Sequence, residues 1–185
     1  LRVDSASAEG WTARGLWNYN AGDLAEAARA LVHALRLDSL QAETWHFSGM
    51  PYSVDRLDLP EIAAPYFGRA VALDPDLRNS WRHLALSRAH QGRLPEAEAL
   101  LDTALSRGPW PAGSIERAFV RAARGNLAGA LADAAEVERS GAAGGSLAGV
   151  NLAADQWRAV FALAAGDTSG APVLLAALRT SPTSD

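Results

Sequence analysis

Four histidines are the side chains of this sequence best suited to proton transfer or metal binding. They are His33, His46, His83 and His90. On a helix, His83, Ser87 and His90 would share one face, but the two histidines would stand two turns, roughly 10 Å, apart. Two ligands at that separation cannot share one metal ion, so the sequence predicts no metal site.

Motifs of known catalytic sites are absent from the sequence. It has no H-E-x-x-H zinc motif, Walker loop, G-x-S-x-G nucleophile motif or EF-hand loop. The lack of cysteine excludes thiolate catalysis and leaves the compartment open, and a cytoplasmic location is our expectation. We therefore predict no enzyme activity, no catalytic residue and no cofactor. An enzyme with an unrecognised site is the lesser alternative.

The charge of the chain argues against several classes of partner. The formal net charge is −4, so no basic field exists to attract phosphate backbones or anionic lipid. No apolar run approaches the roughly 18 residues of a membrane-spanning helix. Nucleic acid and membrane are therefore not expected partners. All 17 basic residues are arginine, a bias that we attribute to a GC-rich bacterial genome.

The elements that must carry any site come from an internal repeat. The segment from Leu1 to Trp11 returns almost letter for letter from Leu35 to Trp45, a shift of 34 residues, and a third copy leads to Trp81 after a shift of 36. A glycine followed by a leucine–alanine motif recurs at Gly22, Gly92, Gly125 and, more weakly, Gly166. Such periods indicate stacked units, none of which can bury its apolar face alone.

Each unit has the apolar spacing of two helices. From Leu24 to Leu37, apolar residues recur every three or four positions, which is typical of an amphipathic helix. We expect helices over 9–19, 24–37, 79–90, 94–107, 114–123, 127–139, 147–165 and 171–180. Each unit is therefore predicted to be a helical hairpin.

Two segments interrupt this pattern. Pro51 and Pro65 should each break a helix, so we expect the first helix of the second unit to stop near Met50 and the second to begin around Ala64. The irregular segment between them is either a binding element or a tolerated surface insertion. The glycine-rich stretch from Ser140 to Gly145 is expected to be a hinge.

These residues resemble the tetratricopeptide repeat (TPR) family, whose pattern is W-x2-L-G-x2-Y, A-x3-F, a further alanine and a proline. The unit from Trp81 matches with Trp81, Leu84, Ala85, Gly92, Ala97, Leu101, Ala104 and Pro109. The resemblance implies an all-α fold, a right-handed α-solenoid of about five helical hairpins. It also implies a single array over residues 1–185, with repeats at 8–41, 42–77, 78–110, 111–144 and 146–185. Residues 1–7 would end a preceding repeat, so we expect the chain to be a fragment of a larger protein.

The family pattern also suggests where a partner would bind. In this family the first helices of successive hairpins line a concave surface. The resemblance maps that surface onto Thr12, Leu16, Tyr19, His46, Met50, Arg82, Leu86, His90, Ile115, Phe119, Gln156 and Val160. One row across the units is apolar in every copy: Leu16, Met50, Leu86, Phe119 and Val160. The row is either an interaction surface or the filling of a tightly wound interior, the second applying above all to Leu86 and Val160.

The partner implied by this surface is another protein. Some relatives clamp a chaperone C-terminus with lysine and asparagine, but Thr12 and Leu16 occupy those positions and only Arg82 is charged. We therefore predict a non-catalytic scaffold that binds an apolar or amphipathic segment, in a setting such as the regulatory tail of a bacterial signalling protein. The alternative is a self-assembling array that uses apolar ends at Leu1–Val3 and at 174–178.

Overall fold

The computed structural model describes residues 7–141, 146–147, 150–151, 154–173 and 176. The chain divides into two compact units, Leu1–Leu100 and Leu101–Asp185, and each is described by itself. Within the described residues no helix is long and apolar enough to cross a bilayer. The expectation that all repeats form one continuous array stays a prediction.

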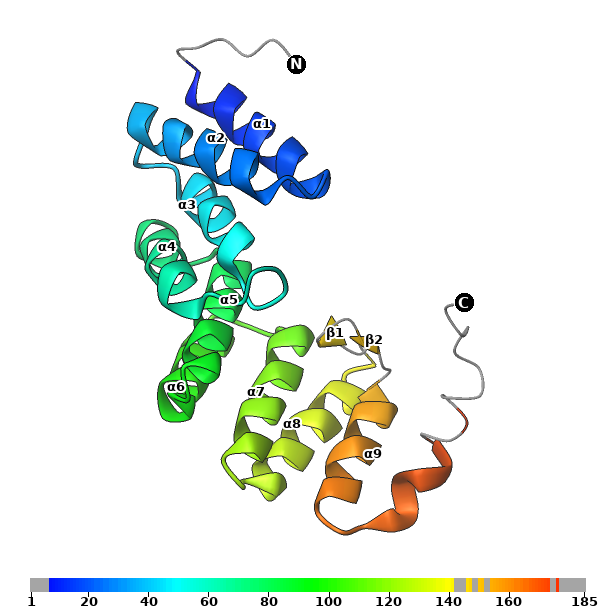
Figure 1. Ribbon diagram of the computed structural model, residues 1–185. Helices are drawn as coiled ribbons and strands as arrows, with labels where there is room; N and C mark the ends of the chain where they lie inside the picture. The colour runs from blue at the N-terminus through cyan, green and yellow to red at the C-terminus, as the bar shows by residue number, and fades with distance from the viewer. Residues whose placement is uncertain (1–6, 142–145, 148–149, 152–153, 174–175, 177–185) are drawn as a thin grey trace. The chain divides into compact units, whose positions relative to one another are not determined.

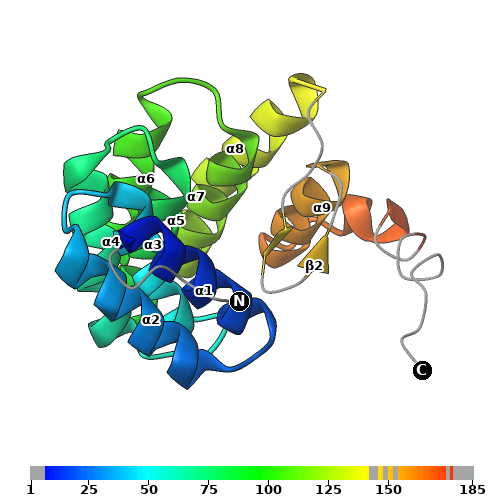
Figure 2. The same cartoon turned by 90° about the horizontal axis from the view of Figure 1, so that it is seen from above.

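The first unit is built of helical hairpins (Figure 1). Its elements are α1 (Ala8–Asn20), α2 (Leu24–Leu37), α3 (Ala42–Gly49), the short 3-10 helix η1 (Met50–Tyr52), α4 (Pro60–Leu73), α5 (Arg78–His90) and the start of α6 (Leu94–Leu105). Helix α1 packs on α2, α3 packs on α4, and α4 packs on α5. Figure 2 shows α1, α2 and α3 side by side, and contacts join all three pairs.

The second unit continues the alternation of helices. It holds the end of α6, followed by α7 (Pro111–Ala123), α8 (Leu127–Arg139), the strands β1 (Ser146–Leu147) and β2 (Val150–Asn151), α9 (Ala154–Ala164) and the 3-10 helix η2 (Thr168–Gly170). Helix α7 packs on α8, and α8 packs on α9. The two strands pair antiparallel, with Ser146 opposite Asn151 and Leu147 opposite Val150.

The repeated glycine motif forms the turn inside a hairpin. Gly22 and Gly125 have φ angles of 84° and 81°, which an L side chain rarely adopts, and each follows the first helix of its hairpin. The next residue then caps the second helix. Asp23 accepts a hydrogen bond from the Glu26 backbone N–H, and Asn126 accepts one from that of Gly129. The recurring sequence therefore ends one helix and starts another.

Small residues bring the two helices of a hairpin close together. An added Cβ at Gly15 would lie 2.5 Å from Leu31 Cγ, and one at Gly49 would lie 2.8 Å from the Phe67 ring. An alanine early in the second helix of each of four hairpins is fully buried, with 0% exposure: Ala27, Ala63, Ala97 and Ala130. Close helix packing around small side chains therefore forms the core of each hairpin.

The prediction for the two prolines is half right. Helix α3 ends at Gly49, just before Pro51, as expected. The expected start of the next helix at Ala64 is wrong, because α4 begins at Pro60 and continues through Pro65. Pro60 occupies the first helical position, where its missing N–H costs little. Pro65 is tolerated because its ring is exposed while Ala63, Ala64 and Phe67 on the same helix are buried.

The C-terminal helices also differ from expectation. The helix predicted from Leu147 begins only at Ala154, and the residues before it include the two strands. Gly149 and the β-branched Val150 lower helix propensity in this stretch. Of the helix predicted over 171–180, residues 171–173 and 176 are helical and the others lie outside the described residues. Most of the predicted glycine hinge, 142–145, and of the predicted preceding repeat, 1–6, also lie outside them.

Candidate functional site

A hollow between the first two repeats contains two of the predicted partner-binding residues. We call it the α1–α3 groove, and its volume is about 600 Å³. Its lining residues are Glu9, Thr12, Ala13, Leu16, Gln41, Ala42, Glu43, Thr44, Phe47 and Asp74. Helices α1 and α3 are the first helices of their hairpins, so the hollow lies where the family resemblance places a binding surface.

One hydrogen bond between the two helices and one within the N-terminal turn of α3 fix the floor of the groove. Thr12 Oγ1 and Thr44 Oγ1 lie 3.0 Å apart, and the Thr44 hydroxyl lies 3.1 Å from the Gln41 side-chain oxygen to which it donates. Leu16 and Phe47 remain half-buried beside these hydroxyls. The groove therefore offers two partly open apolar side chains next to a polar floor that is already hydrogen-bonded.

The rim of the groove is acidic. Glu9, Glu43 and Asp74 are its charged lining residues, and no arginine or histidine lines it. Glu9 and Glu43 are 34 residues apart, at equivalent repeat positions in the first turns of α1 and α3, where the positive ends of the helix dipoles favour a carboxylate. Neither makes a hydrogen bond or ion pair with another described residue. Their negative charge therefore faces solvent around the opening.

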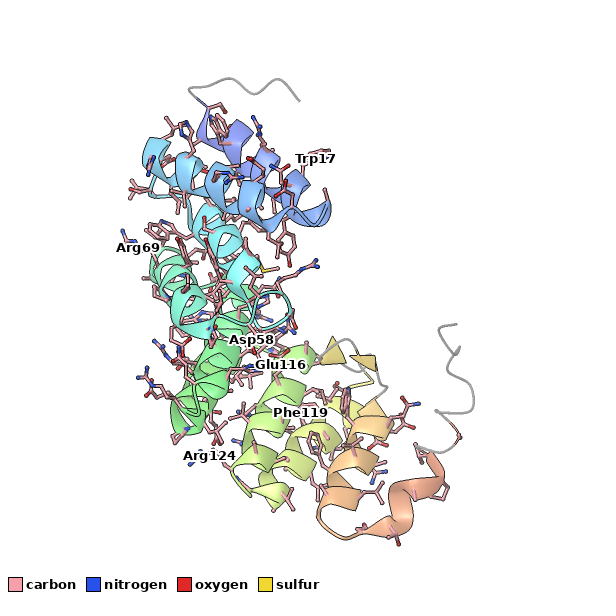
Figure 3. The ribbon with its side chains drawn as sticks, viewed as in Figure 1. Trp17, Asp58, Arg69, Glu116, Phe119 and Arg124 are labelled. Carbon is pink, nitrogen blue, oxygen red and sulfur yellow. The ribbon has the colours of Figure 1, made fainter. Side chains whose placement is uncertain are left out.

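The irregular segment before α4 contacts two other residues of the predicted binding surface, Tyr19 and His90. The Arg56 Nε–H donates to the Tyr19 hydroxyl over 2.9 Å, and its guanidinium lies 4.6 Å from the centre of the Tyr19 ring. Asp58, labelled in Figure 3, lies 3.0 Å from His90 Nδ1. This insertion therefore contacts the C-terminal ends of α1 and α5, and it holds Tyr19 and His90 in contacts within the chain.

His46 is not available to a partner. It is only 7% exposed, and its Nδ1 lies 2.9 Å from Ser80 Oγ. Its ring lies 5.5 Å from that of His83. Burial lowers the pKa of His46 to about 4. Burial, together with the charge of Arg82 and the neighbouring His46, lowers the pKa of His83 to about 3. Both imidazoles are therefore neutral core groups at neutral pH.

The remaining predicted binding positions of the first unit are half-buried. Met50 packs against a buried cluster around Phe67. Arg82 and Leu86 are partly exposed, and neither lines the α1–α3 groove. The groove thus contains Thr12 and Leu16 and leaves the other predicted positions of this unit outside it.

In the second unit the predicted positions belong mainly to a core. Ile115 is 1% exposed. Phe119, labelled in Figure 3, packs edge-on against Trp157 and Phe161, with ring centres 4.7 and 5.0 Å away. Val160 packs on the same cluster, and Gln156 is half-buried. Phe119 and Val160 therefore pack against an interior cluster, as the second alternative for the apolar row supposed.

Eight of the ten lining residues of the α1–α3 groove were not predicted from the sequence. Ala13 and Phe47 are 34 residues apart, as are Glu9 and Glu43, so both pairs occupy equivalent positions of the repeat. Comparing the repeats column by column, beyond the family pattern, would have identified these positions. Within the described residues no group of three or more histidine or acidic side chains could hold a metal ion.

Comparison with known proteins identifies the fold. No protein-family model and no curated protein matches the chain. Solved structures, in contrast, do match the chain. A crystal structure of PilW, a widely conserved type IV pilus biogenesis factor, has a TM-score of 0.79 and 22% identity over 97% of this chain and 81% of that one. A crystal structure of MamA has a TM-score of 0.71 and 18% identity over 93% and 90%.

A third similar structure contains a bound peptide. The first TPR of Spaghetti (RPAP3), bound to an HSP90 peptide, has a TM-score of 0.61 and 20% identity over 68% of this chain and 98% of that one. These identities establish the fold alone. The repeat pattern, the helical hairpins and the structural neighbours agree that this chain has an all-α, tetratricopeptide-type helical-repeat fold.

Proposed function

We propose that this chain is a non-catalytic scaffold that binds a segment of another protein in the α1–α3 groove. The observation that carries the proposal is the combination of half-open Leu16 and Phe47 with an acidic rim in one hollow between first helices. Anchoring by a few apolar side chains, with charge around them, is how helical grooves usually hold a peptide. The peptide bound to the Spaghetti TPR is a precedent for this fold.

The chemistry of the groove indicates which kind of partner segment it would bind. Leu16 and Phe47 call for a bulky apolar side chain, while Glu9, Glu43 and Asp74 favour basic residues beside it. A peptide C-terminal carboxylate is disfavoured because the lining holds no basic residue to receive it. The expected partner is therefore an amphipathic segment with an apolar anchor and flanking arginine or lysine.

A labelled peptide tests this proposal. The basic probe is a fluorescein-labelled peptide with one phenylalanine between pairs of arginines, and its binding is measured by fluorescence anisotropy. The double substitution Glu9→Arg with Glu43→Arg should weaken binding about tenfold or more, since it replaces attraction by repulsion. Truncation by Leu16→Ala with Phe47→Ala should weaken it to a similar degree.

Matched controls separate the groove from general charge. Glu136→Arg makes the same kind of change on an exposed face of α8 and should leave binding unchanged. A basic probe with alanine in place of phenylalanine should bind weakly to every variant. Equal binding of both probes, or full affinity in the groove variants with helicity preserved, would refute the proposal.

Self-assembly remains the second candidate. Exposed apolar side chains on the first unit, such as Trp17 at 60% and Leu40 at 72%, favour it because they could meet a second copy. Sedimentation over a wide concentration range decides between the two, since a strict monomer excludes self-assembly. The cytoplasmic location and the role as a regulatory tail stay predictions.

A further inference from the structure

A second hollow lies on the side of the second helices. We call it the α2–α4 pocket, and its volume is about 600 Å³. Its lining residues are Val32, Leu35, Arg36, Ser39, Trp45, Ile62, Pro65 and Tyr66. It shares no lining residue with the α1–α3 groove, and the proposed function leaves it without a role.

The walls of this pocket are aromatic and held in place by internal contacts. The Trp45 indole N–H donates to the Ser39 carbonyl over 2.8 Å. The ring of Tyr66 lies 6.0 Å from that of Trp45 and stacks on Tyr52 at a centre distance of 6.0 Å. A pocket with walls fixed in this way needs little reordering when a side chain enters it.

The apolar rim of the pocket is open to solvent. Ile62 is 45% exposed, and the Pro65 ring is exposed one turn further along α4. Exposed apolar side chains beside an apolar hollow are typical of an interaction site. The pocket is therefore suited to one bulky apolar side chain of a partner.

The charge around the pocket is positive, in contrast to the α1–α3 groove. Arg36 is its charged lining residue. Arg69 lies one turn beyond Pro65 and Tyr66 on the same face of α4, and Figure 3 shows it at the outer edge of that helix. Both arginines are exposed, and neither makes an ion pair or hydrogen bond with another described residue. The nearest acidic side chains in the sequence, Asp38 and Glu61, do not line the pocket.

From these contacts we propose that the α2–α4 pocket binds an acidic segment of a partner protein. One bulky apolar side chain of that segment sits among Leu35, Trp45 and Ile62, and flanking carboxylates pair with Arg36 and Arg69. The net charge of −4 opposes an acidic ligand at long range, so its attraction must come from these local arginines. Guanidinium groups are well matched to such carboxylates because they can form paired hydrogen bonds.

The test uses an acidic probe, a fluorescein-labelled peptide with one phenylalanine between pairs of glutamates. The double substitution Arg36→Glu with Arg69→Glu should weaken its binding about tenfold or more in an anisotropy titration. The same variant should bind the basic probe more tightly than the parent chain does. The circular dichroism spectrum of this variant should match that of the parent chain, so that the weakened binding of the acidic probe cannot be explained by unfolding.

Two further variants locate the binding. Ile62→Asp should weaken the acidic probe without changing helicity, because this side chain is already half in solvent. Arg139→Glu reverses a charge on the exposed end of α8 and should leave the acidic probe unchanged. The groove variant Glu9→Arg with Glu43→Arg should not weaken the acidic probe, which keeps this proposal distinguishable from the first.

Three outcomes would overturn the proposal. One is an acidic probe that does not bind, or that binds equally well with alanine in place of phenylalanine. Another is full binding of the acidic probe to the Arg36→Glu, Arg69→Glu variant. The third is concentration-dependent dimerisation that Ile62→Asp abolishes, because the occupant of the pocket would then be a second copy of this chain.

Discussion

At the scale of single residues, glycines decide how closely the helices pack, because they have no side chain. Gly15 and Gly49 occupy the same position of successive repeats, and each faces a large side chain of the second helix, Leu31 or Phe67. Gly68, in contrast, has no heavy atom from outside its own stretch of helix backbone within 4 Å of the place that a Cβ would take. Gly15 and Gly49 therefore leave room for a side chain of the second helix, whereas Gly68 has no such packing role.

Alanine substitutions should reveal this difference. Gly49→Ala is expected to lower the free energy of unfolding by about 1–3 kcal/mol, because its Cβ would overlap the Phe67 ring. Gly68→Ala should raise it by up to about 1 kcal/mol through helix propensity alone. Urea denaturation followed by circular dichroism measures both. A Gly49→Ala variant as stable as the parent chain would contradict the packing argument.

The buried histidines make stability depend on pH. The folded pKa values of His46 and His83, about 4 and about 3, lie below the value near 6.5 of an exposed imidazole. The unfolded chain therefore binds protons first as the pH falls below about 6.5, and stability is lost from there down toward the folded pKa values. Each histidine should lower the free energy of unfolding by about 2 kcal/mol between about pH 7.5 and pH 5.

Urea titrations of the parent chain and of the His46→Gln, His83→Leu double variant at both pH values measure this loss. The double variant should lose much less stability on acidification, because the two groups no longer titrate. The carboxylates titrate in both proteins, so the difference between the two isolates the histidines. Equal losses would show that the imidazoles are protonated in the folded state.

At the scale of elements, helix α4 forms although its own sequence opposes it. Pro65 has no N–H to donate to the Glu61 carbonyl, yet the helix continues to Leu73. Burial of Ala63, Phe67 and Ala70 on one face outweighs that local cost. Tertiary packing therefore decides where this helix begins.

Replacing each proline of α4 by alanine measures how much that proline destabilises the helix. Pro65→Ala restores a helical hydrogen bond and should raise the free energy of unfolding by up to about 3 kcal/mol. Pro60→Ala should give no gain, because the first helical position has no such bond to restore and Pro60 is buried. Thermal and urea unfolding of the two variants provide the comparison. A Pro65→Ala variant no more stable than Pro60→Ala would refute this account of α4.

Charged side chains join three helices of the second unit. Asp133 on α8 accepts hydrogen bonds from Arg117 Nη2 at 2.7 Å and from Arg121 Nη1 at 2.9 Å, both on α7. Arg117 also donates to Asp102 on α6 over 2.6 Å. Asp133 is 5% exposed, so its charge depends on these partners.

Removing the two carboxylates should have unequal effects. Asp133→Ala is expected to lower the free energy of unfolding by about 3–5 kcal/mol, because it removes the buried carboxylate with which both partly buried guanidinium groups pair. The Asp102 side chain is 49% exposed, and Asp102→Ala should cost at most about 1 kcal/mol. Urea denaturation measures both. Similar small losses would show that solvent replaces Asp133 as the partner of the arginines.

At the scale of the whole molecule, one repeat architecture presents two hollows of opposite charge. The charged lining residues of the α1–α3 groove are carboxylates, that of the α2–α4 pocket is Arg36, and no residue lines both. Both belong to the first unit. A chain with these two surfaces could hold two segments of different charge at the same time.

The two probes should therefore bind independently. Saturation with an unlabelled basic probe is expected to change the dissociation constant of the acidic probe by less than about twofold, since sites without shared residues usually act additively. A competition titration followed by anisotropy measures this. Mutual displacement of the two probes would mean that they share one site, and would contradict the assignment of separate hollows.

The periodicity of the sequence predicted most of the helices. The recurrence of tryptophan, alanine and glycine at fixed offsets predicted hairpins, and Gly22 and Gly125 stand at their turns because a positive φ favours glycine. The helix over Leu127–Arg139 was predicted to the residue. These features depend on neighbours a few positions apart in the chain, so the sequence shows them directly.

Contacts between repeats determined the rest. Leu16 lines an open groove, while His46 is sealed against Ser80, a residue 34 positions away. Pro65 sits inside a helix because distant side chains bury its neighbours. The opposite charges around the two hollows also arise from different helices brought together. By itself the sequence determined the helical hairpins, because those depend on local spacing. Only the tertiary structure decided which side chains remain open to a partner, because that depends on how neighbouring repeats cover one another.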